Sequence, residues 1–147
     1  MRNRAIALVL CAILSACAGN NASLSNDTLV NNGDGTVLSE KFNLQWQQKI
    51  SKRFNSAEEA AEYVKNLALG GHTDWRIPSK AESHNLFFSM DFGKSNAKNL
   101  QMKMDRSMWV ELENGALQAG TWDAGETCCI VRTFKKDSKG GVRAVRP

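Results

Sequence analysis

Apolar residues recur every three or four positions between residues 57 and 68, a spacing that predicts an amphipathic helix. The repeating positions are Ala57, Ala60, Ala61, Val64, Leu67 and Ala68. Ser56 and Glu59 form the capping box expected at the start of this helix, and Gly70-Gly71 ends it. Because the apolar face is mostly alanine, we expect this helix to lie close against a sheet.

A second, shorter helix is predicted to begin after Pro78. Ser79 is its N-terminal cap, and Glu82 completes another capping box. The buried side of this helix is supplied by Leu86, Phe87 and Met90. Residues 91–106, rich in Asn, Lys and Ser, are predicted to form a loop.

Short stretches of strand-forming residues surround the two helices. The expected strands are residues 36–38, 44–46, 108–113, 127–134 and 142–146, with a turn over 137–141. Asn114-Gly115 predicts a tight hairpin that pairs Leu112 with Leu117 and Val110 with Ala119. This order of elements predicts an α+β fold, in which two helices pack on short antiparallel strands and hairpins.

The first 17 residues resemble the signal of a bacterial lipoprotein. Two arginines precede an apolar run that is well short of the roughly 20 residues needed to span a bilayer. Leu14-Ser15-Ala16-Cys17 then resembles a lipoprotein cleavage box, in which the cysteine thiol carries the lipid. The alternative is an ordinary secretory signal, which would not need Cys17. We expect cleavage after residue 16 and lipidation of Cys17; Ala18 at the next position favours the outer membrane.

The rest of the chain divides into a tether and one domain. Residues 17–32 are small and polar without a period, as in a flexible linker that carries the lipid. Residues 33–147 are enough for a single domain with its own core. The membrane is therefore the first expected partner, reached through the lipid anchor at the bacterial cell envelope.

The charge of the mature chain is low, but it is unevenly spread. Two of the 19 basic residues lie in the signal, which leaves 17 against 15 acidic residues and argues against a nucleic-acid partner. Basic residues gather near the C-terminus, at Arg132, Lys135, Lys136, Lys139, Arg143 and Arg146. This cluster either attracts an anionic ligand or consists of solvated strand edges, where lysines oppose aggregation.

Catalytic and metal-binding patterns are weak in this sequence. His72 and His84 are twelve residues apart with no further ligand spacing, so no metal and no cofactor is expected. The adjacent Cys128-Cys129 has no evident base beside it, and we expect a protein that is not an enzyme. These two cysteines could be free thiols, a strained vicinal disulfide, or an intermolecular bridge.

A specific block, Asp74-Trp75-Arg76-Ile77-Pro78, follows Gly70-Gly71. It resembles the signature of the bacterial domain family named for the C-terminal domain of a Legionella collagen-like protein. Supporting matches lie at residues 34–37, 44–47 and 142–146, whereas Val110-Glu111 and Ala144 depart from the family pattern. The resemblance implies a C-type-lectin-like fold. The chemistry of the block itself favours structural roles for Asp74, Trp75, Arg76 and Pro78, with ligand contact as the alternative; Arg76 could bridge backbone carbonyls or an acidic partner such as Asp74.

Aromatic and basic side chains are the candidate ligand contacts. Of the four tryptophans, Trp122 lies in a glycine-flanked segment that reads as a turn, so we expect it to be the most exposed. The candidate ligand-binding residues are Trp122, Arg132, Lys135, Lys136, Lys139 and Arg143. We expect recognition or adhesion through a glycan or an anionic polysaccharide. The alternative is a structural envelope protein that binds another protein through its last strand or through the Asn114-Gly115 hairpin.

Overall fold

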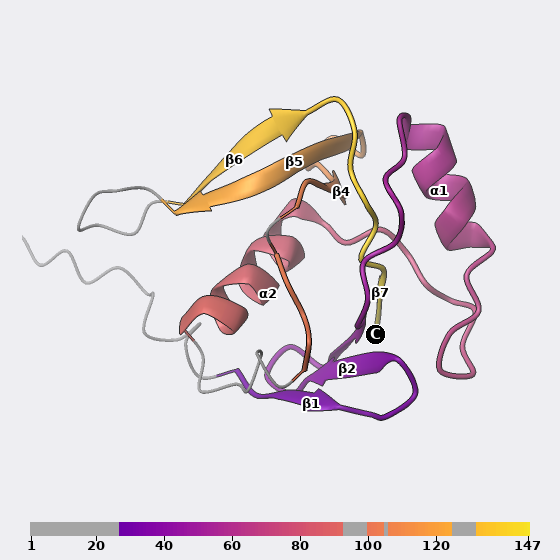
Figure 1. Cartoon of the computed structure of the whole chain (residues 1–147), viewed down its shortest axis with the longest axis vertical. Coiled ribbons are helices and arrows are strands. Elements are labelled where there is room, and N and C mark those ends of the chain that lie inside the picture. Colours follow the sequence, from indigo (N-terminus) through magenta and orange to yellow (C-terminus); the bar gives the residue numbers. More distant parts are fainter. Residues whose placement is uncertain (1–26, 93–99, 105, 125–131) are drawn as a thin grey trace, which may run out of the picture.

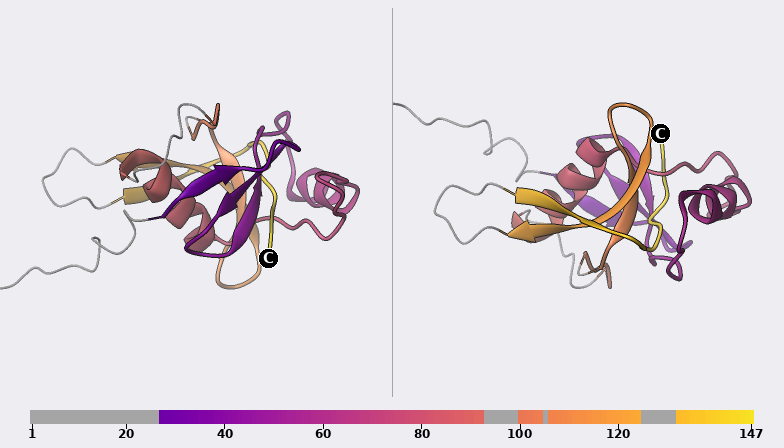
Figure 2. Two further views of the ribbon diagram at one scale, coloured as in Figure 1. Left: turned by 90° about the horizontal axis from the view of Figure 1, so that it is seen from below. Right: turned by 90° about the horizontal axis from the view of Figure 1, so that it is seen from above.

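A computed structural model describes residues 27–92, 100–104, 106–124 and 132–147 of the chain. Helix α2 (Lys80–Phe92) lies between two antiparallel sheets, of four and three strands, and helix α1 (Ala57–Lys65) lies at one side of the molecule (Figures 1 and 2). The predicted signal, Cys17 and the Cys128-Cys129 pair lie outside the described residues.

The first sheet has the strand order β1-β2-β3-β7. Its strands are β1 (Leu29–Asn31), β2 (Thr36–Ser39), β3 (Leu44–Gln47) and β7 (Val145–Arg146). On its far side β7 also meets Arg76, whose N–H donates to the carbonyl of Val145 at 2.9 Å, so neither edge of β7 is free. Within the described residues, β7 is thus paired on both sides, by β3 and by Arg76.

The second sheet has the order β4-β5-β6. Its strands are β4 (Met108–Glu111), β5 (Leu117–Ala124) and β6 (Arg132–Asp137). The predicted hairpin between β4 and β5 forms, but its register is shifted by one residue: Glu111 pairs with Leu117, and Trp109 with Ala119. The N–H of Gly115 donates to the carbonyl of Leu112 at 2.9 Å, and Gly115 has a φ of 79°. The loop is thus one residue longer than a two-residue turn, with the glycine in the left-handed position.

Both helices begin where their capping boxes predict. The N–H of Glu59 donates to Ser56 Oγ at 3.2 Å, and the N–H of Glu82 donates to Ser79 Oγ at 3.1 Å. Helix α1 is shorter than its apolar repeat suggests, because Asn66 ends it and the chain then turns through reciprocal hydrogen bonds between Leu69 and His72.

Two apolar clusters hold the layers together. The first joins α1 to the β4–β5 hairpin and includes Ala60, Val64, Trp75, Trp109 and Ala119. The second joins α2 to the first sheet and includes Val37, Trp46, Leu86, Met102 and Val145. Helix α2 is consequently the middle layer, and it also contacts β4 on its other side.

The expected α+β, C-type-lectin-like fold is wrong, because the protein is mostly β. Seven strands form the two sheets, and only two helices accompany them in the described part of the chain. Isolated β-bridges, such as Phe54 with Gly140 and Met108 with Gly141, further tie loop segments to one another or to a strand. Such pairings join residues far apart in sequence, so local periodicity gives them no signal.

The predicted tether, residues 17–32, overlaps the folded domain at its C-terminal end. Leu29 is buried in β1, which pairs with β2. Asp27 is buried as well, and its carboxylate accepts hydrogen bonds from Ser39 Oγ at 2.8 Å and from the N–H of Lys41 at 3.1 Å. The domain therefore includes residues 27–32, which the small polar composition of this segment concealed.

Arg143 is buried rather than available to a ligand, with a relative exposure of 2 %. Its guanidinium donates to the carbonyl of Gln47 at 2.9 Å, to that of Gln48, and to that of Lys103 at 2.9 Å. It therefore joins the end of β3 to the segment that precedes β4. This part of the predicted ligand-binding set is corrected to a structural role.

Candidate functional site

The largest of the described grooves lies between the start of α2 and the sheet β4-β5-β6, with a volume of about 780 Å³. Four segments of the chain form it: the first turns of α2, the end of β4 with the turn that follows, and the paired strands β5 and β6. Its lining residues are Ser79, Lys80, Ala81, His84, Asn85, Glu111, Leu112, Glu113, Trp122, Thr133 and Phe134. We refer to it as the α2 groove.

Aromatic rings form the floor of the α2 groove. Trp122 and Phe134 are direct cross-strand partners in β5 and β6, and their ring centroids are 5.2 Å apart. The His84 ring adds an edge contact to Trp122 at 4.8 Å. Gly120 provides the room for Phe134: a Cβ at this position would lie 2.5 Å from a carbon of that ring. Cross-strand aromatic pairs of this kind stabilise a sheet as well as shape a site.

The environment of Trp122 differs from the sequence prediction. It lies in β5, not in a turn, and only 9 % of it is exposed. Its indole N–H donates to Ser83 Oγ at 3.0 Å, which fixes the ring against α2. Trp122 is thus the fixed base of the groove, and Phe134, which is half-buried, presents more of its surface.

Charged and polar side chains surround this floor. The exposed Lys80 places its Nζ 5.6 Å from the centroid of the Phe134 ring. Glu111 and Glu113, both exposed, line the end of the groove that β4 contributes. An apolar floor with a few polar groups around it is the usual composition of a small-ligand site.

The predicted basic residues do not form one surface. Lys135 pairs with Asp123, and Lys135 and Lys136 point to opposite faces because successive side chains of a strand alternate. Lys139 is exposed in the turn after β6, where its carbonyl accepts a hydrogen bond from Arg53 at 3.1 Å. The side chain of Arg132 lies outside the described residues. Together with the burial of Arg143, these positions disperse the expected anion-binding cluster.

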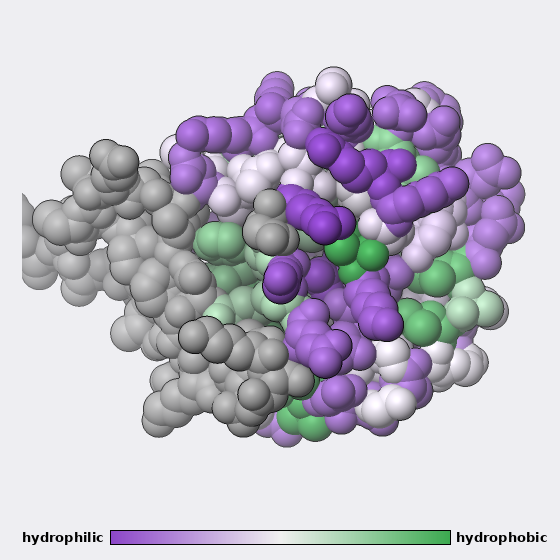
Figure 3. Space-filling model, in the orientation of Figure 1, coloured by the Kyte–Doolittle hydropathy of each residue, from purple (hydrophilic) through white to green (hydrophobic). Residues whose placement is uncertain are grey.

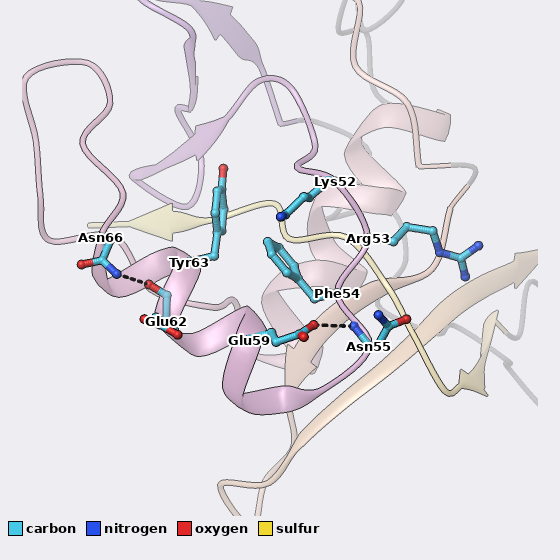
Figure 4. A pocket seen from close by; sticks show the side chains of 8 residues that line it. All are labelled: Lys52, Arg53, Phe54, Asn55, Glu59, Glu62, Tyr63 and Asn66. Atoms are coloured by element: carbon cyan, nitrogen blue, oxygen red, sulfur yellow. Dashed lines mark hydrogen bonds between the residues drawn. The ribbon is translucent and has the colours of Figure 1, made fainter.

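A smaller groove of about 450 Å³ lies beside α1 (Figure 4). Phe54 and Tyr63 line it with ring centroids 5.1 Å apart, but Lys52 already places its ammonium 5.6 Å from the Phe54 ring centroid. Glu59 is also engaged, since it accepts a hydrogen bond from the N–H of Asn55 at 2.9 Å. This groove is smaller than the α2 groove, and its Glu59 carboxylate already has a hydrogen-bond partner within the chain.

The Asp74–Pro78 block has structural contacts in this fold. The indole N–H of Trp75 donates to the carbonyls of Leu69 and His72, at 3.2 and 3.1 Å. Arg76 pairs with Glu82, at 2.8 and 2.6 Å, rather than with the nearby Asp74. This pair lowers the pKa of Glu82, because the guanidinium hydrogen-bonds the ionised carboxylate.

Asp74 and Pro78 complete the block. Asp74 accepts two hydrogen bonds from Arg146, at 2.7 and 3.0 Å, and these lower the pKa of its carboxyl. The carbonyl of Pro78, a buried residue, accepts from the N–H of Glu111 at 2.9 Å. The block therefore positions the start of α2 beside β4. These two elements form walls of the α2 groove.

The hydroxyl of Ser107 and the carboxylate of Asp137 are close enough to resemble a nucleophile and its base, but they form a structural hydrogen bond. Ser107 Oγ donates to Asp137 at 2.5 Å, and this hydrogen bond is the main reason why the pKa of Asp137 is lowered. A carboxylate with a lowered pKa is a weaker general base. Within the described ranges, no three His, Cys, Asp or Glu side chains gather as metal ligands.

The surface seen in Figure 3 is mostly hydrophilic, with small, separate apolar patches. Among the described residues, the large apolar residue that is exposed is Val30 in the edge strand β1, with a relative exposure of 37 %. Neither α1 nor α2, the described helices, combines the length and hydropathy required of a membrane span.

Sequence reasoning found Trp122 but missed Lys80, His84, Glu111, Glu113 and Phe134. Phe134 carried the one usable signal, as an aromatic residue within a strand of charged residues. The exposed hairpin at Asn114-Gly115 lies next to Glu113 but does not line the groove. Comparison with protein-family models, with curated proteins and with solved structures finds no match to this chain.

Proposed function

We propose that this protein is a non-enzymatic recognition protein of a bacterial envelope, and that its α2 groove binds a glycan. The observation that carries the proposal is the paired Trp122–Phe134 floor within a polar rim. Aromatic faces pack against the C–H face of a sugar ring, and the rim supplies groups that hydrogen-bond its hydroxyls.

A glycan read by stacking fits this groove better than a polyanion read by charge. The basic residues expected to attract a polyanion are dispersed, and two carboxylates line the groove itself. Binding of a polyanion would also weaken steeply with salt, because exposed charges are screened. We therefore expect stacking on Phe134 to dominate the affinity.

Replacing Phe134 by alanine is expected to weaken the binding of an uncharged β-linked oligosaccharide by about two- to tenfold, since an aromatic contact contributes roughly 0.5–1.5 kcal/mol. Isothermal titration calorimetry measures this change. Tyr63→Ala, at the other groove, is the matched control and should leave the affinity unchanged. Equal loss in both variants, or binding confined to sulfated polymers and indifferent to Phe134, would contradict the proposal.

The envelope location is part of the same proposal and depends on Cys17. The described domain begins at or before Asp27, so only a short segment would separate it from a lipid on Cys17. Cells fed labelled palmitate should therefore incorporate label into the wild-type protein and not into Cys17→Ala. Cys11→Ala, which changes a cysteine within the signal, is the control. Label that survives in Cys17→Ala would remove the anchor from the proposal.

A further inference from the structure

The α2 groove is electrically asymmetric. Glu111 and Glu113 line the end that β4 contributes, and both side chains are exposed to solvent. Glu111 ends β4 and Glu113 lies in the turn that follows, and both line the groove, so their carboxylates face the same ligand space. Lys80 is the lysine of the groove, and its Nζ lies over the Phe134 ring rather than in an ion pair with either carboxylate.

The two carboxylates have no ion-pair partner among the described residues. The charge of Glu111 acts on the guanidinium of Arg76, but that guanidinium forms two hydrogen bonds with the carboxylate of Glu82. Formation of that pair accounts for most of the rise in the pKa of Arg76, and Glu111 contributes less. Glu111 and Glu113 thus remain available to a cation from outside.

We propose that the groove selects glycans that carry a free amino group, with the ammonium beside Glu111 and Glu113 and the sugar ring against Phe134. This inference rests on the proposed glycan function and names the class of sugar. A carboxylated or sulfated sugar would place like charges together at the β4 end, which is unfavourable. An N-acetylated sugar would stack equally well but would lack the charge that the carboxylates recognise.

The size of the preference follows from the exposure of the groups. Exposed ion pairs are weak, and two of them together correspond to about a three- to tenfold tighter binding of the amino sugar at low salt. The preference should disappear at high salt, because a separation of a few ångströms is screened in concentrated electrolyte. Stacking of the sugar ring on Phe134 does not depend on an ion pair, so binding through this contact should remain at high salt.

The test compares three oligosaccharides of equal length: one with free amines, its N-acetylated form, and an acidic one. Binding to the full chain is measured by calorimetry at about pH 6, where sugar amines are protonated and carboxyl groups in general are ionised. We expect the double variant Glu111→Gln, Glu113→Gln to bind the amine and its N-acetylated form with equal affinity, because glutamine keeps the hydrogen-bonding atoms of the rim and removes their charge. Glu40→Gln with Glu62→Gln removes the same charge from exposed sites outside the groove and should keep the preference.

The remaining outcomes contradict either the preference for amino sugars or the glycan function itself. If the double variant keeps the preference, or if the acidic sugar binds most tightly, the inference is wrong and the glycan function stands. If none of the three binds, the glycan function itself is wrong. A tetralysine peptide is the fourth probe. If it binds as tightly as the amino sugar, and Phe134→Ala does not weaken either ligand, the groove recognises cations without recognising sugars, and both proposals fail.

Discussion

Replacing Arg143 by methionine is expected to lower the free energy of unfolding by about 3 kcal/mol, the largest effect among the substitutions considered. Methionine keeps most of the buried volume but donates no hydrogen bond. The carbonyls of Gln47, Gln48 and Lys103 then lose a charged donor in the interior. Hydrogen bonds to a charged group contribute roughly 1.5–3 kcal/mol, and a buried acceptor left without a partner costs about 1–3 kcal/mol.

Urea denaturation followed by tryptophan fluorescence measures this loss. Lys139→Met makes the same chemical change in the exposed turn after β6 and should leave the midpoint unchanged. A midpoint for Arg143→Met equal to that of the wild type would show that the three carbonyls do not depend on this guanidinium.

Replacing Gly120 by alanine is expected to cost about 2 kcal/mol, within the range for overpacking of a tight site. The added Cβ would lie 2.5 Å from the carbonyl oxygen of Lys135, a backbone atom that cannot rotate away, and would also meet the Phe134 ring. The strand pair must open or the ring must leave the groove. Glycan binding should therefore fall together with stability.

A double-mutant cycle separates the two contacts. Gly120→Ala should cost less in a Phe134→Ala background, because one of the two clashes has been removed. Thermal unfolding of the four proteins gives the coupling free energy. Strict additivity would mean that the ring does not occupy the space above Gly120.

Local signals were sufficient for the start of each helix. Ser56 and Ser79 cap α1 and α2 as expected, because the capping hydrogen bonds form within three residues and need no tertiary context. The end of α1 was less predictable. Leu67 and Ala68 continue the apolar repeat, but they belong to a turn that places Trp75 against the core.

Tertiary pairing accounts for the errors in the strands. Asn114-Gly115 marks the correct hairpin, yet the sequence does not distinguish a two-residue turn from the longer loop with Gly115 at positive φ, and the register moves by one residue. The same limit explains the wrong fold class. Bridges such as Arg76 with Val145 join segments about seventy residues apart, and no local pattern anticipates them.

The candidate site illustrates why function is harder to read than elements. Trp122 was identified from its residue type and its glycine-flanked position, and its assumed exposure was wrong because Ser83 and α2 cover it. The other walls come from α2, β4 and β6, which meet only after folding. The family resemblance, which concerned the Asp74–Pro78 block, stays a prediction.

The position of β7 has a consequence for how this chain acquires its fold. Arg146 and Val145 pair with β3 about a hundred residues earlier, and Val145 also bridges to Arg76 in the middle of the chain. Contacts of such long sequence separation slow folding, since a large loop must close before they form. A nascent polypeptide cannot complete this sheet until residue 146 has been synthesised, so the pairing of β3 with β7 forms only after that point.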